Sequence, residues 1–271
     1  MANMTSSVSA SQVAGELASA TFEEIPALVE HYREDPRQQV IKACERALKR
    51  HAKELSERER VNGMYELMHE LGGDGVVVGV DEVGRGSVAG PLTVCAVCLP
   101  MEPRIWGIND SKKLTPARRE LLSVKIAEVA TAIGFCHIAP ADIDEMGMAR
   151  AIRAAVAGAV ADTGLEPDCV LMDGNPLGAV PHERDVVKGD AKIACIAAAS
   201  IMAKVTRDEM MVEYDAEYPE YHLAESKGYA SPEHIEAIRK HGLSPLHRVS
   251  FCGNFLQTER LFLGQLWRQG P

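Results

Sequence analysis

The stretch VVVGVDEVGRG, residues 76–86, decides the fold class and the place to look for a functional site. Valine dominates its first five residues, which predicts a buried strand over Val76–Val80 because β-branched side chains favour extended backbone. Two carboxylates, Asp81 and Glu82, follow directly and lead into a glycine-rich turn. Negative charges at the edge of an apolar core cost free energy unless a partner neutralises them, so this pair indicates a counter-ion.

Apolar runs and helical spacing elsewhere in the sequence predict an α/β fold around this strand. Further strands are expected at 92–99, 133–138, 169–172 and 185–187, and helices at 115–132, 148–162, 191–214, 231–242 and 255–268. The early strands follow one another without helices between them, whereas the later strands alternate with helices. This order predicts a mixed β-sheet flanked by helices and not a fully parallel sheet.

The ends of the chain differ from this pattern. Residues 1–20 are rich in Ser and Ala and are expected to be disordered, whereas residues 21–72 have a charged helical pattern. Residues 73–271 are expected to form the main domain, with a helical C-terminal part from about residue 205. The helical region carries a group of cations: Lys42, Arg46, Lys49, Arg50 and Lys53. We favour a solvated helix face for them, and a phosphate-contacting arm is the alternative.

Composition sets limits on location and partners. The chain has 271 residues, 46% of them hydrophobic, and a formal net charge of −10, which argues against a general affinity for nucleic acid. Local basic clusters nevertheless remain, for example at Lys112 and Lys113. The seven cysteines suggest no disulfide framework, and the pair Cys95 and Cys98 should face opposite sides of a strand, so we expect reduced thiols and no zinc site. There is no signal peptide and no membrane span, which predicts a cytoplasmic protein.

The glycines of the turn also match a dinucleotide-binding pattern. Gly84, Gly86 and Ala89 have the spacing of a fingerprint that binds NAD, but such a fingerprint must begin a helix. Gly90 and Pro91 intervene here, and a second strand is expected at once. The dinucleotide interpretation therefore fails on context, although the glycines still let backbone N–H groups approach a ligand closely.

Two further acids follow apolar runs in the same way. Asp173 follows CVLM, and Asp190 precedes a predicted helix. Taken singly, Asp173 could belong to a turn and Asp190 could cap a helix. Taken together with Asp81 and Glu82, they could converge on one edge of the sheet, where mutual repulsion would require divalent cations. Oxygen ligands suit Mg²⁺ or Mn²⁺, and two such ions would support hydrolysis of a phosphodiester.

Several motifs resemble those of bacterial ribonuclease HII and occur in the order of that family. They lie between about Val76 and Phe251 and are GVDEVGRGSVAGPL, NDSKKLTPARRE, MDGN, VKGDAKIACIAAASIMAKVTRDEM and SKGYASPEHIEAIRKHGLSPLHRVSF. The resemblance implies a ribonuclease H-like fold with an N-terminal helical extension. It also implies hydrolysis of the RNA strand of RNA–DNA hybrids and cleavage on the 5′ side of single ribonucleotides embedded in duplex DNA. The products would carry 3′-hydroxyl and 5′-phosphate ends, as ribonucleotide excision repair requires.

The resemblance also implies roles for individual residues. The acids that would hold Mn²⁺ or Mg²⁺ and catalyse hydrolysis are Asp81, Glu82, Asp173 and Asp190. The residues that would contact substrate are Gly84, Arg85, Gly86 and Tyr229. The glycine turn would contact the ribose 2′-hydroxyl, Tyr229 would stack on the following deoxyribose, and Asp208 would support the site.

Two other functions match parts of the sequence. The related ribonuclease HIII would have a differently folded N-terminal domain, which the helical pattern of residues 21–71 does not favour. A hybrid-binding module without catalysis would not need all four acids, and all four are intact. We therefore expect a monomeric enzyme that acts on RNA–DNA hybrids and on DNA with embedded ribonucleotides, without a membrane.

Overall fold

The computed structural model describes residues 8–256 and divides the chain into two compact units, one on each side of the Asn62–Gly63 peptide bond. The first unit contains α1 (Ala10–Ser19), α2 (Ile25–His31) and most of α3 (Gln38–Gly72). Its small core is formed by Val13, Leu17, Ile25, Val40, Ala43 and Ala47. The predicted domain boundary after residue 72 lies at the end of α3, whereas the compact units divide within that helix.

Helix α1 corrects one sequence-based expectation. Residues 1–20 were expected to be disordered, but residues 10–19 form this helix. Its first turn has a capping box, because Ser9 and Gln12 each bond the other's backbone N–H. Val13 and Leu17 are also fully buried. The composition of the segment concealed a cap and a short apolar stripe, which together stabilise a helix.

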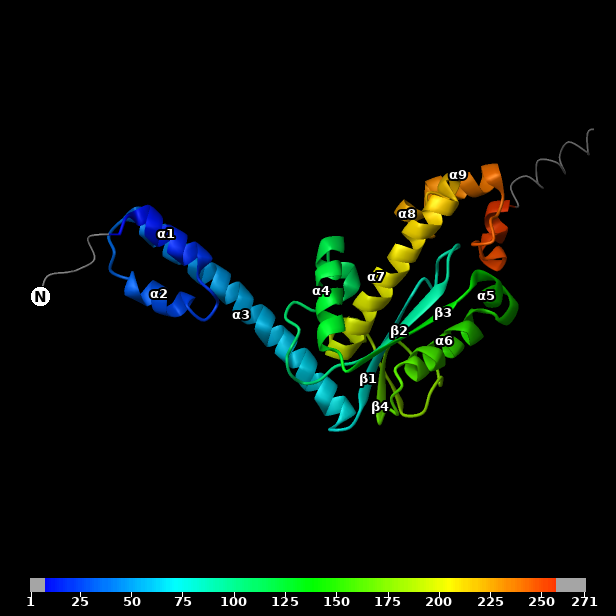
Figure 1. Cartoon of the computed structure of the whole chain (residues 1–271), viewed down its shortest axis with the longest axis horizontal. Coiled ribbons are helices and arrows are strands. Elements are labelled where there is room, and N and C mark those ends of the chain that lie inside the picture. Colours follow the sequence, from blue (N-terminus) through cyan, green and yellow to red (C-terminus); the bar gives the residue numbers. More distant parts are fainter. Residues whose placement is uncertain (1–7, 257–271) are drawn as a thin grey trace, which may run out of the picture. The chain divides into compact units, whose positions relative to one another are not determined.

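The second unit is built on a mixed β-sheet (Figure 1). Its strands in the described residues are β1 (Val77–Val83), β2 (Leu92–Cys98), β3 (Ala132–Ile138), β4 (Cys169–Asp173) and β5 (Glu183–Val186). They are ordered β3–β2–β1–β4–β5, with β1 antiparallel to β2 and parallel to β4. The prediction of a mixed sheet is confirmed.

Helices cover both faces of this sheet. Val78 and Val80 of β1 pack with residues of α6 (Met148–Asp162), and Gly79 points to the opposite face, against α7 (Ala194–Glu217). A Cβ atom on Gly79 would lie 2.3 Å from the carbonyl carbon of Cys195. Only glycine therefore allows α7 to lie this close to the centre of the sheet, and α4 (Pro116–Val129) packs against α7 in turn.

The C-terminal part forms a second apolar cluster around the end of α7. Met211 packs there with residues of α8 (Leu223–Ser226) and α9 (Pro232–His241), and with Val88 and Ala89 from the loop after β1. Residues 249–256 are helical, and the rest of the helix predicted at 255–268 lies outside the described residues. The short helix α5 (Pro140–Met146) was not predicted. No helix within residues 8–256 is long and apolar enough to cross a membrane.

Candidate active site

Strand pairing brings two of the predicted acids to the same face of the sheet. The strand β1 was predicted to end at Val80, but it continues to Val83 because β2 pairs with it beyond that point, with Asp81 opposite Cys95. Pairing with β4 stops at Val80 and Met172, one residue before each aspartate. Residues alternate between faces, so Asp81 and Asp173 lie on the face that α7 covers, as Gly79 does.

Asp190 reaches the same region from another element. A helix cap was the alternative role for Asp190, and the structure does not support it, because Asp190 lies in a short 3₁₀ turn, Gly189–Ala191, and the residue that precedes α7 is Ile193. The backbone N–H of Gly189 donates a hydrogen bond of 2.7 Å to Asp173 Oδ1. This bond holds the turn that carries Asp190 against the end of β4.

The acids affect one another's protonation. Burial raises the pKa of Asp81 well above its usual value, and the charge of Glu82 raises it further, while a hydrogen bond from Ser200 acts in the opposite direction. Burial also raises the pKa of Glu82, with a further contribution from Asp173. The pKa of Asp190 is raised by burial and then by Asp173. All three acids therefore lie where negative charge accumulates in a poorly solvated place.

Two protein cations lie beside this cluster. Arg85 Nη1 is 3.6 Å from Glu82 Oε1, and Lys112 Nζ is 3.7 Å from Asp190 Oδ2. The sequence suggested that metal ions alone would balance the acids, and the structure corrects this point. Both cationic side chains are largely exposed, at 60% and 79%, so each ion pair is weak and a competing cation can replace it.

The carboxylate oxygens of the four acids are of the chemical type that binds a hard divalent cation. Carboxylate oxygens are the ligands that Mg²⁺ and Mn²⁺ prefer. The pKa values of Asp81 and Asp190 are raised first by burial and then by a neighbouring carboxylate, which is Glu82 for Asp81 and Asp173 for Asp190. Among the described side chains, however, no group of three or more His, Cys, Asp or Glu converges as a ligand set. Asp173 and Asp190 face Gly189 and Lys112 instead. Binding an ion would therefore require these carboxylates to turn away from their present partners.

Three residues of this region were missed in the sequence. Asp110 shares a hydrogen bond with Asp190 and also accepts one from the backbone N–H of Lys112. Ser200 of α7 bonds Asp81, and its hydroxyl lies 2.8 Å from that of Ser111. The motif NDSKKL contains Asp110 and Ser111 and belongs to the family pattern, but in the sequence alone only its lysines stand out, as a basic cluster.

The glycine turn is held from behind by two buried arginines. Gly84 has φ +85, and a Cβ atom there would lie 2.3 Å from Arg207 Nε. The fully buried Arg207 donates hydrogen bonds to four groups: Pro91 O, Ala89 O, Lys227 O and Ser87 Oγ. The fully buried Arg248 bonds Gly90 O and Arg85 O. These bonds fix the backbone of residues 84–91, called loop 84–91 below.

Tyr229 lies beside this loop. Its side chain is 40% exposed, and its ring centre is 5.8 Å from the Arg207 guanidinium. The backbone N–H groups of Val88 and Ala89 both donate to Gly228 O, directly before Tyr229. The structure therefore brings Gly84, Arg85, Gly86 and Tyr229 into one connected region.

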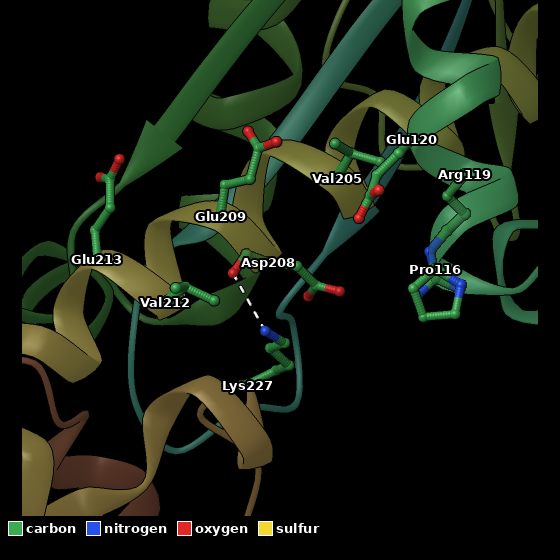
Figure 2. Close-up of a pocket in the computed structure, with 9 residues that line it drawn as sticks. All are labelled: Pro116, Arg119, Glu120, Val205, Asp208, Glu209, Val212, Glu213 and Lys227. Carbon is green, nitrogen blue, oxygen red and sulfur yellow. Dashed lines mark hydrogen bonds between the residues drawn. The ribbon is translucent and has the colours of Figure 1, made fainter.

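Asp208 has different surroundings. Its carboxylate forms an ion pair of 2.7 Å with Lys204. The backbone carbonyl oxygen of Asp208 accepts a hydrogen bond of 3.4 Å from Lys227 Nζ. This bond lies at the edge of a cavity of about 450 Å³ (Figure 2). That cavity lies between α4 and α7 and is lined by Pro116, Arg119, Glu120, Val205, Asp208, Glu209, Val212, Glu213 and Lys227. Within residues 8–256, no hydrogen bond or ion pair links the Asp208 side chain to the other four predicted acids.

Known proteins match this arrangement over most of the chain. The sequence model of ribonuclease HII matches residues 78–254, and that of the ribonuclease HII N-terminal domain matches residues 9–71. The chain belongs to the ribonuclease HII family. It is 42% identical to ribonuclease HII of Geobacillus thermodenitrificans over 225 residues, which cover 82% of this chain and 87% of that protein. It is 43% identical to ribonuclease HII of Ruminiclostridium cellulolyticum over 204 residues, 74% of this chain and 80% of that protein.

Solved structures agree with the family assignment. Ribonuclease H2 of Pyrococcus horikoshii superposes with a TM-score of 0.59 at 27% identity, over 68% of this chain and 98% of that one. Ribonuclease HII of Archaeoglobus fulgidus, solved in complex with PCNA, gives 0.56 at 25% identity, over 64% and 94% of the two chains. A ribonuclease HIII solved with Mn²⁺ shares the fold, with a TM-score of 0.56 at 20% identity over 72% of each chain. The predicted ribonuclease H-like fold is confirmed, and the chain is a ribonuclease H enzyme of the HII family.

Proposed function

We propose that this ribonuclease of RNA–DNA hybrids also cuts on the 5′ side of single ribonucleotides embedded in duplex DNA, leaving 3′-hydroxyl and 5′-phosphate ends. The observation that carries the proposal is the arrangement of two features on adjoining elements. A cluster of acids lies on β1, β4 and the turn before α7, and loop 84–91 with Tyr229 follows directly from β1. A reacting phosphate bound at the acids would then lie next to loop 84–91, which would contact the sugar of the same nucleotide.

In this proposal Asp81, Glu82, Asp173 and Asp190 hold divalent ions, Mn²⁺ or Mg²⁺. When bound, the ions would supply the positive charge that activates a water and stabilises the departing 3′-oxygen. The chain's own groups keep the acids in place: Ser200 and the Glu82 N–H both bond Asp81. Asp208 would support the site indirectly through its pair with Lys204.

Loop 84–91 and Tyr229 would read the junction between ribose and deoxyribose. The 2′-hydroxyl is the group that distinguishes RNA from DNA, and a loop rich in glycine brings backbone groups close to it. A Cβ atom on Gly86 would contact nothing within 4 Å, so space lies beside this position. The half-exposed ring of Tyr229 would stack on the following deoxyribose, where an added hydroxyl would collide with it.

The test uses an end-labelled DNA duplex with one ribonucleotide, incubated with the protein and Mg²⁺ or Mn²⁺. An all-DNA duplex and a duplex with four ribonucleotides serve as controls. We expect one cut on the 5′ side of the lone ribonucleotide and none in the Asp81→Asn variant. Cleavage of the longer tract alone would refute the junction mechanism, and activity in the variant would refute the role of Asp81. Binding of hybrid without cleavage in either metal would favour a non-catalytic binding module.

The proposal includes a monomeric protein that acts in the cytoplasm on hybrids and on DNA with embedded ribonucleotides, as part of ribonucleotide excision repair. The abundance of free thiols and the acidic net charge of −10 are compatible with that setting. Sedimentation of the full chain with and without a hybrid duplex would measure the stoichiometry directly. A stable dimer at micromolar concentration would contradict this part of the proposal.

A further inference from the structure

Two buried histidines form a chain of hydrogen bonds behind Tyr229. His234 is fully buried and His247 is 3% exposed. His234 Nδ1 lies 2.9 Å from the carbonyl oxygen of Tyr229, and His234 Nε2 lies 3.1 Å from His247 Nε2. His247 Nδ1 in turn lies 3.0 Å from the backbone nitrogen of Ser244. Every ring nitrogen of the pair therefore has a partner.

The partners at the two ends determine where the protons lie. The backbone N–H of Ser244 can only donate, so His247 Nδ1 accepts and the proton of a neutral His247 is on Nε2. That N–H donates to His234 Nε2, so the proton of His234 is on Nδ1 and donates to Tyr229 O. The chain of bonds runs in one direction, from Ser244 to Tyr229.

The surroundings favour two neutral rings. The ring of Tyr221 packs against both histidines, with its centre 4.7 Å from that of His247, and it also contacts the ring of His241. A charge on His222 would lower the pKa of His234. Within the described residues, no carboxylate forms a hydrogen bond or ion pair with either ring. Burial lowers the pKa of both imidazoles, and the repulsion that a protonated His234 would exert lowers the pKa of His247 further. A proton added to His234 Nε2 would face the N–H of His247, and a proton added to His247 Nδ1 would face the N–H of Ser244.

The same pair is connected to loop 84–91 through the backbone. His247 forms a β-bridge with Ala89, and the flanking bonds join Gly90 N to Leu246 O and Arg248 N to Val88 O at 2.8 Å each. The residues on either side of His247 are therefore bonded to the loop, while the ring of His247 supports the carbonyl of Tyr229 through His234. The pair links the two groups that would contact neighbouring sugars.

We propose that His234 and His247 are positioning residues that set the place of Tyr229 relative to loop 84–91, and through it the preference for a single ribonucleotide over a ribonucleotide tract. This inference rests on the proposed function. In a tract, the sugar that follows each ribonucleotide except the last carries a 2′-hydroxyl, so a correctly placed Tyr229 ring disfavours cleavage at these internal positions. A displaced ring would accept both sugars.

The first test compares kcat/KM for cleavage at a lone ribonucleotide with kcat/KM for cleavage at the internal ribonucleotides of a four-ribonucleotide tract. His234→Leu removes both hydrogen bonds, and we expect the ratio of the two values to fall about tenfold. His234→Asn keeps an N–H donor near the position of Nδ1, and we expect its ratio to stay within about threefold of the wild type. His137→Leu, which removes an imidazole from β3, is the control and should leave the ratio unchanged. An unchanged ratio in a folded His234→Leu protein would overturn the proposal.

A double-mutant cycle separates positioning from general loss of structure. Because the effect is transmitted by Tyr229, adding His234→Leu to Tyr229→Ala should lower the ratio no further. Additive losses would show that the histidines act on the fold and not on Tyr229. Thermal unfolding of each variant establishes that the compared proteins are folded.

A measurement on the unaltered protein completes the test. With ¹⁵N-labelled histidine, the imidazole signals at pH 7.5 should show a proton on Nδ1 of His234 and on Nε2 of His247. The opposite tautomers, or a charged ring, would overturn the inference. If the wild type cuts neither duplex, the proposed function fails and the positioning role fails with it, whereas the tautomers still report whether the hydrogen-bond chain exists.

Discussion

Acidification from pH 7.5 to 4 should destabilise the fold through His247. Burial and the neighbouring His234 lower the pKa of His247 from its usual 6.5 to about 4. In the unfolded chain the same imidazole takes up a proton near pH 6.5. The unfolded state therefore binds more protons than the folded state between these two pH values, and protonation favours unfolding there.

This difference in bound protons determines how the free energy of unfolding changes with pH. The contribution of His247 is fully present above pH 6.5 and is lost as the pH falls from 6.5 towards 4. At about 1.36 kcal/mol for each pH unit, the free energy of unfolding should fall by about 3 kcal/mol over this range. Because His247 is only 3% exposed, solvent does little to reduce the effect. A loss of this size is a large part of the stability of an ordinary domain.

Urea denaturation at several pH values would measure it, with His247→Gln as the comparison. Glutamine cannot take up a proton in this range, although its amide can still donate to His234. We expect the variant to be less stable than the wild type at pH 7.5, and the gap between the two to close by about 3 kcal/mol at pH 4. His31→Gln, which removes an exposed imidazole from α2, serves as the control variant. Parallel curves for His247→Gln would refute the assignment of a neutral buried pair.

Further predictions concern the acids and the glycine turn. Asp81→Asn should abolish cleavage. In the absence of metal it should also raise the thermal unfolding temperature, because burial and Glu82 destabilise the charged carboxylate of Asp81. A lower unfolding temperature would contradict this explanation. Mn²⁺ at a hundred times its dissociation constant should stabilise the wild type by about 2.7 kcal/mol in calorimetry, and Asp190→Asn should reduce that gain. Gly84→Ala should cost about 1–2 kcal/mol in urea denaturation, because Gly84 has φ +85, and should displace Arg207. Gly63→Ala, at a helical position where a Cβ atom meets nothing within 4 Å, should not destabilise the protein.

The sequence predicted those features that depend on local pattern. The strands β1 and β4 are central and buried, so they appear as apolar runs, and the acids that follow them stand out against those runs. The helix α6 has the predicted bounds, 148–162, because its apolar residues recur with helical spacing. Family motifs then indicated which acids to group, which periodicity alone could not decide.

Other features depend on contacts between distant parts of the chain. Arg207 bonds Pro91 across 116 positions, and no local pattern distinguishes this buried arginine from a surface cation. The end of β1 was misplaced because pairing with β2 extends it beyond the apolar run. The pairing of His234 with His247 likewise depends on how the C-terminal segment folds back over loop 84–91.

One consequence of α7 concerns the spacing between the two halves of the site. Ser200 on this helix bonds Asp81, and Arg207, two turns later, bonds loop 84–91. Seven residues along a helix correspond to about 10 Å, and one inserted residue would rotate everything beyond it by about 100°. The helix thus fixes the distance between the acids and the loop, and the close contact at Gly79 fixes its position along its own axis. Redesign of substrate preference in this enzyme should therefore vary the loop and the face of Tyr229, and leave the length of α7 unchanged.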